Sequence, residues 1–365
     1  MPLPVTAQAA VVTAPSTSEV RDLRLPDIAD DAGLLRVEAT GVCGTDVRDY
    51  PRPDLAPRVM GHEIVGTVER IGAGARLRWP VSEGDRVLLE EYLPCGQCPT
   101  CRSGDYRLCP ATDIVHNADA VRYGATPVER SPGLWGGYAQ YLYLHPRTVF
   151  HRVDPSVDPM HLTLAIPLSN GYEWAYRVGG IGPGECCVVL GPGQQGLACV
   201  VAAKQAGAWP VVVTGLGRDA RRLDIARTLG ADVAVDVEHD DLTEVVRRAT
   251  DGAMAAVVVD TAAGDAVTTS AAFQALRQGG TLVLAARQKQ PIEFEINQVR
   301  DKALSVRGVR GHSYRAVEWA LSLLASGWTG TEALGGTVFA LKELHEALAA
   351  AGSGEVVHAC VDPWR

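Results

Sequence analysis

The chain has 365 residues, of which 47% are hydrophobic and 21% charged, and this length suits two domains better than one hydrophobic core. The formal net charge is −9 and no basic stripe is interleaved with aromatic residues, which argues against nucleic acid as a partner. Because no apolar run reaches the roughly 18 residues of a membrane helix, and the N-terminus lacks the basic start and apolar core of a secretory signal, we expect a cytoplasmic protein without a membrane partner.

The first part of the chain, residues 1 to about 160, combines short apolar runs with Gly and Pro. Runs such as "LLRVEATGV", "IVGTVERIGAG" and "GGYAQYLYL" alternate apolar and polar residues, and turn residues separate them at short intervals. This pattern predicts a strand-rich, barrel-like unit.

Within this part, the segment "GVCGTDVRDY" places one cysteine in a glycine-flanked turn, with a hydroxyl and an acid close behind. These residues are Cys43, Thr45 and Asp46. A lone cysteine or histidine is more often part of a core. The later "GHE" adds His62 and Glu63, however, and Cys, His and Glu together suit a catalytic zinc with an open coordination position.

Four cysteines crowd into the stretch "CGQCPTCRSGDYRLC". Their spacing suits four thiolates around one zinc ion, and the residues are Cys95, Cys98, Cys101 and Cys109. Disulfides are a poor alternative, because cysteines so close together in a tight loop are badly placed for bridge geometry. Four protein ligands leave no coordination position open, so we predict a structural zinc in a lobe at about residues 93–112.

From about residue 168 to residue 310 the pattern changes to continuous apolar runs that alternate with helical stretches. The runs are "CCVVL", "PVVVT", "VAVD", "AAVVVD" and "TLVLAA", with helical stretches such as "DARRLDIARTLG" and "DAVTTSAAFQALRQGG". Fully apolar strands between helices predict an α/β unit, a doubly wound parallel sheet covered on both faces. The residues after 310 return to mixed character, with helices expected at 315–325 and 341–351, so this unit is inserted in a discontinuous first domain.

The segment "VVLGPGQQG" carries a strand, a turn with Gly191, Gly193 and Gly196, and the start of a helix. This spacing after an apolar strand lets a pyrophosphate approach the amides at the helix N-terminus. It predicts a dinucleotide site that includes Gln194 and Gln195. A glycine-rich turn without a ligand is the alternative.

The residue that reads the ribose of the cofactor is expected at the end of the second strand of this unit. NAD-binding domains carry Asp or Glu there, whereas this chain has Thr214 and Gly215. Without that carboxylate a 2′-phosphate is not repelled, and the guanidinium of Arg218 could pair with it. The sequence therefore favours NADP over NAD. For the following Arg221 and Arg222, a solvated helix face is the simpler interpretation.

Taken in order, "GVCGTD", "GHEIVGTVERIGAG", "GDRV", the four-cysteine lobe, "GGYAQY", "GPGQQG" and "LGAD" resemble the zinc-containing medium-chain dehydrogenase/reductase family, the group of alcohol, polyol and threonine dehydrogenases. The resemblance covers nearly the whole chain. It implies a Rossmann domain at residues 168–310, inserted in a discontinuous, β-rich, GroES-like catalytic domain of residues 1–167 and 311–365. It also implies an active site in the cleft between the two domains.

The resemblance implies roles for single residues as well. Cys43 and His62 are expected to ligate a catalytic zinc, with Glu63 as a direct or exchangeable ligand. The hydroxyl of Thr45 is expected to take the proton of the alcohol, and Asp46 to orient the ring of His62. The zinc would polarise a carbonyl, or lower the pKa of a bound alcohol, while hydride moves to or from the nicotinamide.

Two positions depart from the family pattern. Relatives commonly carry a further zinc ligand, Cys or Glu, where this chain has Ile166. The zinc must then be held by Cys43, His62 and Glu63, bind weakly or be absent.

The second departure is Arg48, five residues after the first cysteine, where relatives often have a histidine that relays the proton outward. Arginine stays protonated and cannot accept a proton. We expect Arg48 to anchor an anion, either the pyrophosphate of the cofactor or an acidic group of the substrate. A surface arginine paired with Asp49 is the alternative.

The sequence thus predicts an NAD(P)-dependent oxidoreductase that interconverts an alcohol and a ketone or aldehyde, with structural and catalytic zinc. Two other functions stay open: a zinc-independent, NADPH-dependent reductase of an activated C=C bond, and a non-catalytic cofactor-binding protein. The substrate is a small molecule, acidic if Arg48 binds it.

The loop region 116–137 is expected to cover the cleft, where Tyr123, Leu134 and Trp135 could line it, although ordinary packing explains them equally well. The resemblance further implies a homodimer or a homotetramer.

Overall fold

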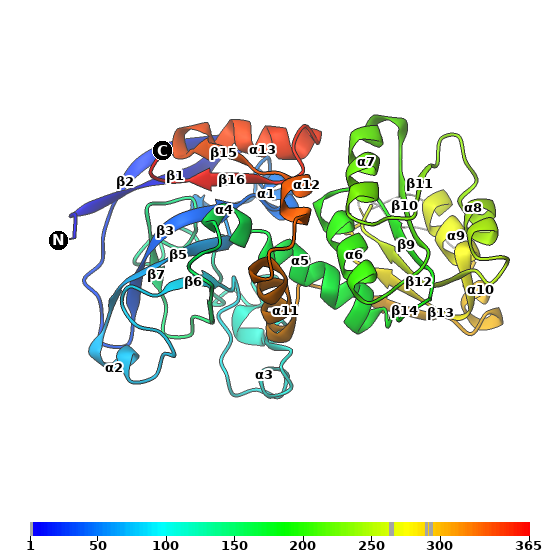
Figure 1. Ribbon diagram of the computed structural model, residues 1–365. Coiled ribbons are helices and arrows are strands. Elements are labelled where there is room, and N and C mark those ends of the chain that lie inside the picture. The colour runs from blue at the N-terminus through cyan, green and yellow to red at the C-terminus, as the bar shows by residue number, and fades with distance from the viewer. Residues whose placement is uncertain (1–2, 263–265, 289–290, 292–294) are drawn as a thin grey trace. The chain divides into compact units, whose positions relative to one another are not determined.

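A computed structural model describes residues 3–262, 266–288, 291 and 295–365. Two compact units make up the chain (Figure 1). One contains the residues up to Ala165 together with Leu321–Thr331 and Gly335–Arg365, and the other contains Ile166–Ala320 and Glu332–Leu334. The domain boundaries at 167/168 and 310/311 stay a prediction beside these units. Among the described residues, no helix has both the length and the apolar character that crossing a bilayer requires.

The first unit is built on a seven-stranded sheet with the order β15-β16-β3-β5-β6-β8, in which β7 also pairs with β3. A smaller sheet has the order β2-β1-β4. The strands are β1 (Thr6–Ala14), β2 (Thr17–Arg24), β3 (Gly33–Gly41), β4 (Arg58–Val59), β5 (Glu63–Ile71), β6 (Arg86–Leu89), β7 (Tyr141–Leu144), β8 (Phe150–Arg152), β15 (Thr337–Ala340) and β16 (Ala359–Asp362). The predicted strand-rich character of this part of the chain is confirmed.

Short helices connect these strands, and two longer ones lie in the C-terminal part of the chain, where residues 314–320 and 332–334 belong to the second unit. They are α1 (Gly44–Asp49), α2 (Ala73–Arg76), α3 (Pro99–Arg102), η1 (Tyr106–Leu108), η2 (Pro110–Thr112), α4 (Pro159–Leu162), α11 (Tyr314–Ala325), α12 (Gly330–Leu334), η5 (Leu341–Glu343) and α13 (Leu344–Ser353). The helices expected at 315–325 and 341–351 correspond to α11 and to η5 with α13.

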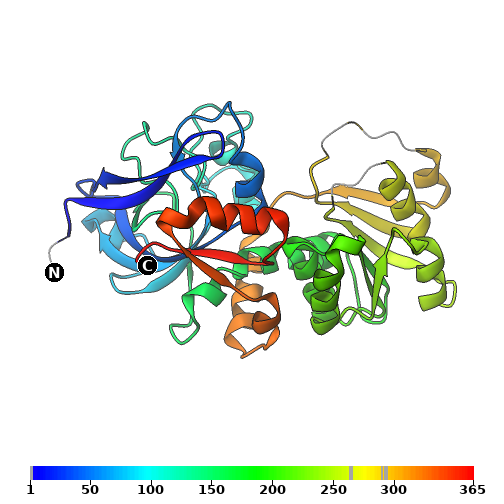
Figure 2. The same cartoon turned by 90° about the horizontal axis from the view of Figure 1, so that it is seen from above.

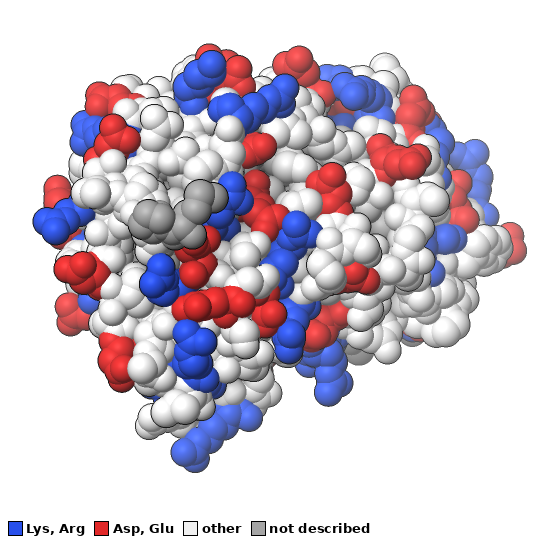
Figure 3. Space-filling model, turned by 60° about the vertical axis from the view of Figure 1, so that its left-hand side comes forward, with Lys and Arg blue, Asp and Glu red and all other residues white. Residues whose placement is uncertain are grey.

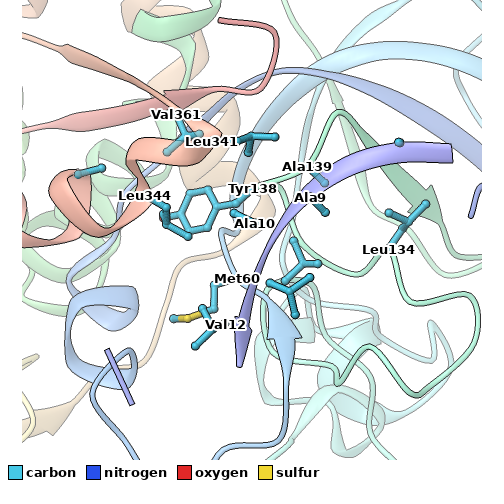
Figure 4. Packing of buried hydrophobic residues seen from close by; sticks show 14 of the residues in the cluster. Ala9, Ala10, Val12, Met60, Leu134, Tyr138, Ala139, Leu341, Leu344 and Val361 are labelled. Carbon is cyan, nitrogen blue, oxygen red and sulfur yellow. The ribbon is translucent and has the colours of Figure 1, made fainter. Parts of the chain in front are cut away.

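A hydrophobic core joins the N-terminal strands to the C-terminal segment of the first unit. Figure 4 shows the ring of Tyr138 between residues of β1, such as Ala10, and residues near the C-terminus, such as Leu344 and Val361. All four are buried. Tyr138 is therefore held firmly, and its hydroxyl is available to a polar partner inside the unit.

The second unit is a six-stranded parallel sheet with the order β11-β10-β9-β12-β13-β14 (Figure 2). The strands are β9 (Cys187–Leu190), β10 (Val211–Gly215), β11 (Val233–Asp236), β12 (Ala255–Asp260), β13 (Leu276–Leu284) and β14 (Ser305–Gly308). In order of sequence this is 3-2-1-4-5-6, the Rossmann order, and the strand order reverses between β9 and β12. The predicted doubly wound sheet is confirmed.

Helices connect the parallel strands. They are α5 (Ala165–Gly171), the π-helix η3 (Tyr172–Val178), α6 (Gln194–Gln205), η4 (Gly217–Asp219), α7 (Ala220–Thr228), α8 (Leu242–Ala249), α9 (Ala266–Ala275) and α10 (Asn297–Asp301). Helix α6 packs against β9 and β10, and α7 packs against β10 and β11, while α9 packs against β12 and β13 and against α8. One detail differs from the prediction: β13 begins at Leu276, so residues 276–280 are strand and not the end of a helix.

Charged side chains are mixed on the surface. On the face of the molecule in Figure 3, acidic and basic side chains alternate without a large patch of one sign. Many of them pair with each other, as Arg247 does with Glu244 at 2.8 Å.

Candidate active site and metal centres

The pairing of β3 with β5 brings the two predicted ligand segments together. In this antiparallel pair Gly41, the last residue of β3, lies opposite Glu63, the first residue of β5. Cys43 follows shortly after the end of one strand, and His62 directly precedes the start of the other. The two segments are separate in the sequence, and they therefore meet at the same end of the paired strands β3 and β5.

Cys43 is fixed by a reciprocal cap at the start of helix α1. Its Sγ accepts a hydrogen bond from the backbone amide of Thr45 over 3.5 Å, and Oδ2 of Asp46 accepts one from the amide of Cys43 over 3.1 Å. Such a capping box satisfies two amides that would otherwise lack partners at the helix start. The thiol and the carboxylate are thus held in fixed positions, and burial raises the pKa of Cys43.

Asp46 also orients the ring of His62. Oδ1 of this buried carboxylate lies 3.4 Å from Nδ1 of His62, and Oδ2 accepts a hydrogen bond from the hydroxyl of Tyr138 over 3.0 Å. A carboxylate on one ring nitrogen leaves the other nitrogen, Nε2, for a metal. Asp46 and His62 are thus in contact, and the role of Asp46 in orienting a zinc ligand stays a prediction.

The imidazole of His62 lies in a strongly acidic environment. Burial alone would lower its pKa, but the negative charges of Asp46, Glu91 and Cys43 outweigh burial and raise the pKa well above its ordinary value.

Glu63 is a buried carboxylate, and neither of its oxygens has a hydrogen-bond partner within the geometric limits among the described residues. Burial raises the pKa of Glu63 to about 8, although the nearby charge of His62 and the thiol of Cys43 act in the opposite direction. The carboxylate packs directly against Gly41, where any side chain would collide with it. Burying a carboxylate without a partner is costly to a fold.

These residues fit zinc by chemistry but do not form a closed site. A thiol, an imidazole nitrogen and an unpaired carboxylate are donors that zinc prefers. In the described part of the chain, however, the four cysteines Cys95, Cys98, Cys101 and Cys109 are the only group whose ligand atoms all lie within 4.8 Å of one another. Cys43, His62 and Glu63 would have to move closer together around a metal.

Thr45 and Arg48 lie on helix α1, beside this cluster. The side-chain hydroxyl of Thr45 is partly exposed and has no hydrogen-bond partner among the described residues. Arg48 is exposed and forms two hydrogen bonds with Asp49, at 2.9 and 3.2 Å. This is the surface ion pair of the alternative interpretation, and the role of Arg48 as an anion anchor stays a prediction.

The sequence did not indicate Glu91 and Arg122, which border the cluster. Oε2 of Glu91 lies 4.0 Å from Nε2 of His62, and the carboxylate forms a two-pronged ion pair with Arg122. In contrast, Tyr123, Leu134 and Trp135, which were candidates to line a cleft, are buried. Tyr123 and Trp135 belong to the packed core of the first unit.

The four-cysteine lobe is assembled as predicted. Sγ of Cys98 and Sγ of Cys101 lie 3.4 Å apart, and the amide of Cys95 donates to Sγ of Cys109 over 3.3 Å. Hydrogen bonds, first from the side chain of Thr100, lower the pKa of Cys98 to about 6, which favours the thiolate that zinc binds. The four sulfur atoms all lie within 4.8 Å of one another, and sulfur atoms on one tetrahedral zinc ion lie about 3.8 Å apart, so the arrangement suits a metal.

The glycine-rich turn lies between β9 and α6, at the reversal of the strand order. Gly191 has a φ of +92°, and Gly193 caps the start of α6. A side chain at Gly196 would collide with the carbonyl oxygen of Gly191, whereas the space around Gly193 is open. Of the glutamines that begin α6, Gln195 has a buried side-chain oxygen for which the described residues offer no hydrogen-bond partner. The turn has the features of a pyrophosphate site.

At the end of β10, Thr214 is buried and its hydroxyl oxygen accepts from the amide of Gly191 over 3.4 Å. Gly215 ends the strand, and Arg218 in the following turn is exposed, with no ion pair among the described residues. One acid was missed: Oε2 of Glu238 accepts a hydrogen bond from the amide of Gly217 over 2.7 Å. A carboxylate thus reaches this turn from the next strand.

Known proteins match the chain in both units. A family model described as "Alcohol dehydrogenase GroES-like domain" matches residues 29–154, and one described as "Zinc-binding dehydrogenase" matches residues 196–326. "Probable alcohol dehydrogenase adh" from Mycobacterium tuberculosis is 44% identical over 327 residues, which cover 88% of this chain and 87% of that protein. The chain belongs to the zinc-containing medium-chain dehydrogenase/reductase family.

More distant members of the family agree with this assignment. Sorbitol dehydrogenase from Halalkalibacterium halodurans is 31% identical over 90% of this chain and 91% of that protein. The structure of alcohol dehydrogenase TADH from Thermus sp. ATN1 superimposes with a TM-score of 0.84 at 26% identity, covering 97% and 99% of the two chains. The chain is accordingly an oxidoreductase of the zinc-type alcohol dehydrogenase family, with a GroES-like domain and a Rossmann-type sheet.

Proposed function

We propose that this dehydrogenase interconverts an alcohol and a ketone or aldehyde by hydride transfer with NAD(P), at a site formed by Cys43, His62 and Glu63. The observation that carries the proposal is the carboxylate of Glu63, which is buried beside a thiol and an oriented imidazole and has no hydrogen-bond partner in the part of the chain that the structure describes. Zinc bound by these three side chains would supply a Lewis acid for the alcohol or carbonyl oxygen.

The residues around the ligands have distinct tasks in this proposal. Asp46 holds Nδ1 of His62, so that Nε2 is the nitrogen offered to the metal. The hydroxyl of Thr45, on the first turn of α1, has no hydrogen-bond partner within the described ranges, and it takes the proton of the alcohol and passes it to water. Arg48, which stays protonated, cannot continue a relay.

Metal content and activity of Cys43→Ser test the proposal. The wild-type chain is expected to hold two zinc ions and to oxidise an alcohol, while Cys43→Ser should hold one and lose at least about 100-fold in kcat. Cys199→Ala removes a buried thiol of α6 and is the matched control. Two zinc ions and full activity in Cys43→Ser would contradict the proposal.

For the cofactor we propose a preference for NADP, with Arg218 as the partner of the 2′-phosphate. Its support is the exposed guanidinium after β10 and the absence of an acid at Thr214 and Gly215. Glu238 opposes this preference, because its carboxylate lies on the same turn and repels a phosphate. The balance between these two side chains sets the selectivity.

One observation favours a second candidate function, the reduction of an activated C=C bond by NADPH. The ligand atoms of Cys43, His62 and Glu63 do not form a compact group, and Ile166 offers no ligand. Hydride transfer to the β-carbon of an alkene needs no Lewis acid. Turnover of an activated alkene that persists after chelation, together with no turnover of secondary alcohols, would establish this second function instead of the first.

A further inference from the structure

Asp260 is a buried acid at the carboxyl end of β12, where the strand order of the second unit reverses. It is the last residue of the strand, and it pairs with Leu190 of β9 on one side and with Leu284 of β13 on the other. Only 3% of Asp260 is exposed. In open α/β sheets, ligands bind outside the carboxyl ends of the strands at such a reversal. The acid therefore lies at the edge of the sheet where a dinucleotide is expected.

The hydrogen bonds of Asp260 connect the loops that follow β12 and β13. In the side chain, Oδ1 accepts from the amide of Ala262 over 3.0 Å, and Oδ2 accepts from Nε2 of Gln288 over 3.2 Å. In the backbone, the carbonyl oxygen accepts from the amides of Ala285 and Ala286, each over 3.0 Å. The loop after β13 is thus bound to Asp260 at its beginning through the backbone and at Gln288 through the carboxylate.

Thr261, the next residue, connects the same segment to the glycine-rich turn. Its hydroxyl oxygen lies 2.7 Å from the carbonyl oxygen of Leu190 and 3.1 Å from that of Gly191. A side chain on Gly191 would begin only 3.0 Å from the β-carbon of Ala262, so the two loops are in close contact. The loops after β9, β12 and β13 therefore form one connected edge with Asp260 and Thr261 at its centre.

The two halves of a dinucleotide are expected on opposite sides of this reversal. A Rossmann sheet consists of two mononucleotide-binding halves, and the cofactor spans the crevice between them. The adenosine half belongs to the side of β10, which Thr214 and Arg218 follow, and the pyrophosphate belongs to the turn between β9 and α6. The nicotinamide half is then expected on the side of β12 and β13, where Asp260 holds the loop.

We propose that Asp260 is a positioning residue for the nicotinamide: through Gln288, it holds the loop 285–288 in the position in which this loop contacts the nicotinamide half of NAD(P). A loop that is ordered before the cofactor arrives does not have to be ordered on binding, which strengthens binding. The inference rests on the proposed function, because it assumes that NAD(P) binds at the glycine-rich turn. It applies to both candidate reactions, since both transfer hydride at the nicotinamide.

Calorimetric titration of the intact chain with NADP and with its nicotinamide-free part, 2′-phospho-ADP-ribose, tests the inference. NAD and ADP-ribose are titrated in the same way. Gln288→Ala is expected to bind the complete cofactor about tenfold more weakly, the effect of losing one hydrogen bond to a charged group. Its affinity for the nicotinamide-free part should stay within about twofold of the wild type, because the adenosine and pyrophosphate positions are unchanged.

Gln274→Ala is the matched control for Gln288→Ala. The side chain of Gln274 also forms hydrogen bonds, with Ser270 and Thr243, but it lies just before β13, at the opposite end of the strand from Gln288. This variant should bind both ligands as the wild type does.

Two substitutions of Asp260 separate its hydrogen bonds from its charge. Asp260→Ala should weaken binding of the complete cofactor at least as much as Gln288→Ala does, and Asp260→Ala/Gln288→Ala no more than Asp260→Ala alone, because both residues act through the same bond. Asp260→Asn should keep the affinity of the wild type, because the amide of Gln288 can turn its oxygen towards the new Nδ2. Gln288 is a half-buried loop residue, so Gln288→Ala carries the test if Asp260→Ala does not fold.

Three results would overturn the inference. If Gln288→Ala weakens both ligands equally, or neither of them, the bond to Asp260 does not position the loop for the nicotinamide, while the proposed function stands. If Asp260→Asn loses as much affinity for the complete cofactor as Asp260→Ala, the charge of Asp260 is what matters and not its hold on the loop. If the wild type binds neither NADP nor NAD, the cofactor of the proposed function fails, and this inference fails with it.

Discussion

The hydroxyl of Tyr138 donates a hydrogen bond to Oδ2 of Asp46 over 3.0 Å, inside the first unit and with both residues buried. Tyr138 comes from a core that packs against the C-terminal segment, and Asp46 from the helix that carries Cys43. This single bond links the core of the unit to the residue that orients His62.

Tyr138→Phe is expected to lower the free energy of unfolding by about 1–3 kcal/mol, because it removes a partner from a buried carboxylate. Since Asp46 then holds His62 less firmly, zinc at Cys43 should bind about 10-fold more weakly. Denaturant unfolding and zinc retention measure the two effects. Tyr141→Phe is the matched control, because no hydrogen bond of the Tyr141 hydroxyl is found among the described residues. Equal effects of the two variants would show that the bond to Asp46 is unimportant.

The buried carboxylate of Glu63 makes the stability of the metal-free chain depend on pH. Its pKa is raised from 4.5 to about 8 in the folded state. Between these values the folded state binds more protons than the unfolded state, so the free energy of unfolding falls as pH rises, by at most about 1.4 kcal/mol per pH unit from this group. His62, whose pKa is also raised, adds a loss of the same sign above its ordinary value of 6.5.

Unfolding of the metal-free wild type and of Glu63→Gln between pH 5 and pH 8 isolates the contribution of Glu63, since both proteins share His62. The wild type is expected to lose more stability across this range than Glu63→Gln does. Parallel stability curves would mean that Glu63 is ionised in the fold throughout. With zinc present the difference should shrink, because the metal replaces the proton.

The parts of the site that were predictable are those encoded by local spacing. The cysteine lobe and the turn from Gly191 to Gly196 each lie within one short segment, so the sequence places their residues together without knowledge of the fold. Glu91 and Glu238 are different. Each reaches its site through the pairing of neighbouring strands, and a register that is not known from the sequence decides which acid faces which residue.

Arg48 shows a further limit of the sequence. Its position on the helix after Cys43 was read from the motif, but Asp49 lies next to it and satisfies the guanidinium locally. The sequence alone does not tell whether the guanidinium of Arg48 binds a neighbouring acid or an anion elsewhere. Ile166 is similar, because an isoleucine where the resemblance implies a ligand is visible in the sequence, whereas the residues that surround the position depend on tertiary structure.

Arg218 and Glu238 are expected to change cofactor selectivity in opposite directions. Arg218→Ala should lower the ratio of kcat/KM for NADP to that for NAD by about tenfold, the effect of losing one charge-assisted hydrogen bond. Glu238→Gln should raise the same ratio about threefold, because it removes a negative charge from the turn at Gly217. Initial rates with both cofactors measure the ratio. If neither variant changes the ratio, other residues determine the cofactor selectivity. Arg222→Ala is the control, because the side chain of Arg222 already pairs with Asp219.

The two metal sites should respond independently to substitution. Cys109→Ser removes the buried thiol of the lobe and is expected to lose one zinc per chain while keeping the metal at Cys43. Without its zinc the lobe should open, because four thiolates hold its short helices in place, so trypsin should cleave at Arg102 and Arg107 faster than in the wild type.

Cys43→Ser should do the reverse: it loses the other zinc and keeps the lobe resistant to trypsin. Cys186→Ser, a buried thiol of the second unit, should leave both the metal content and the cleavage rate unchanged. If Cys109→Ser were to lose both metals in a chain whose unfolding transition is intact, the sites would be coupled and the lobe would have more than a structural role.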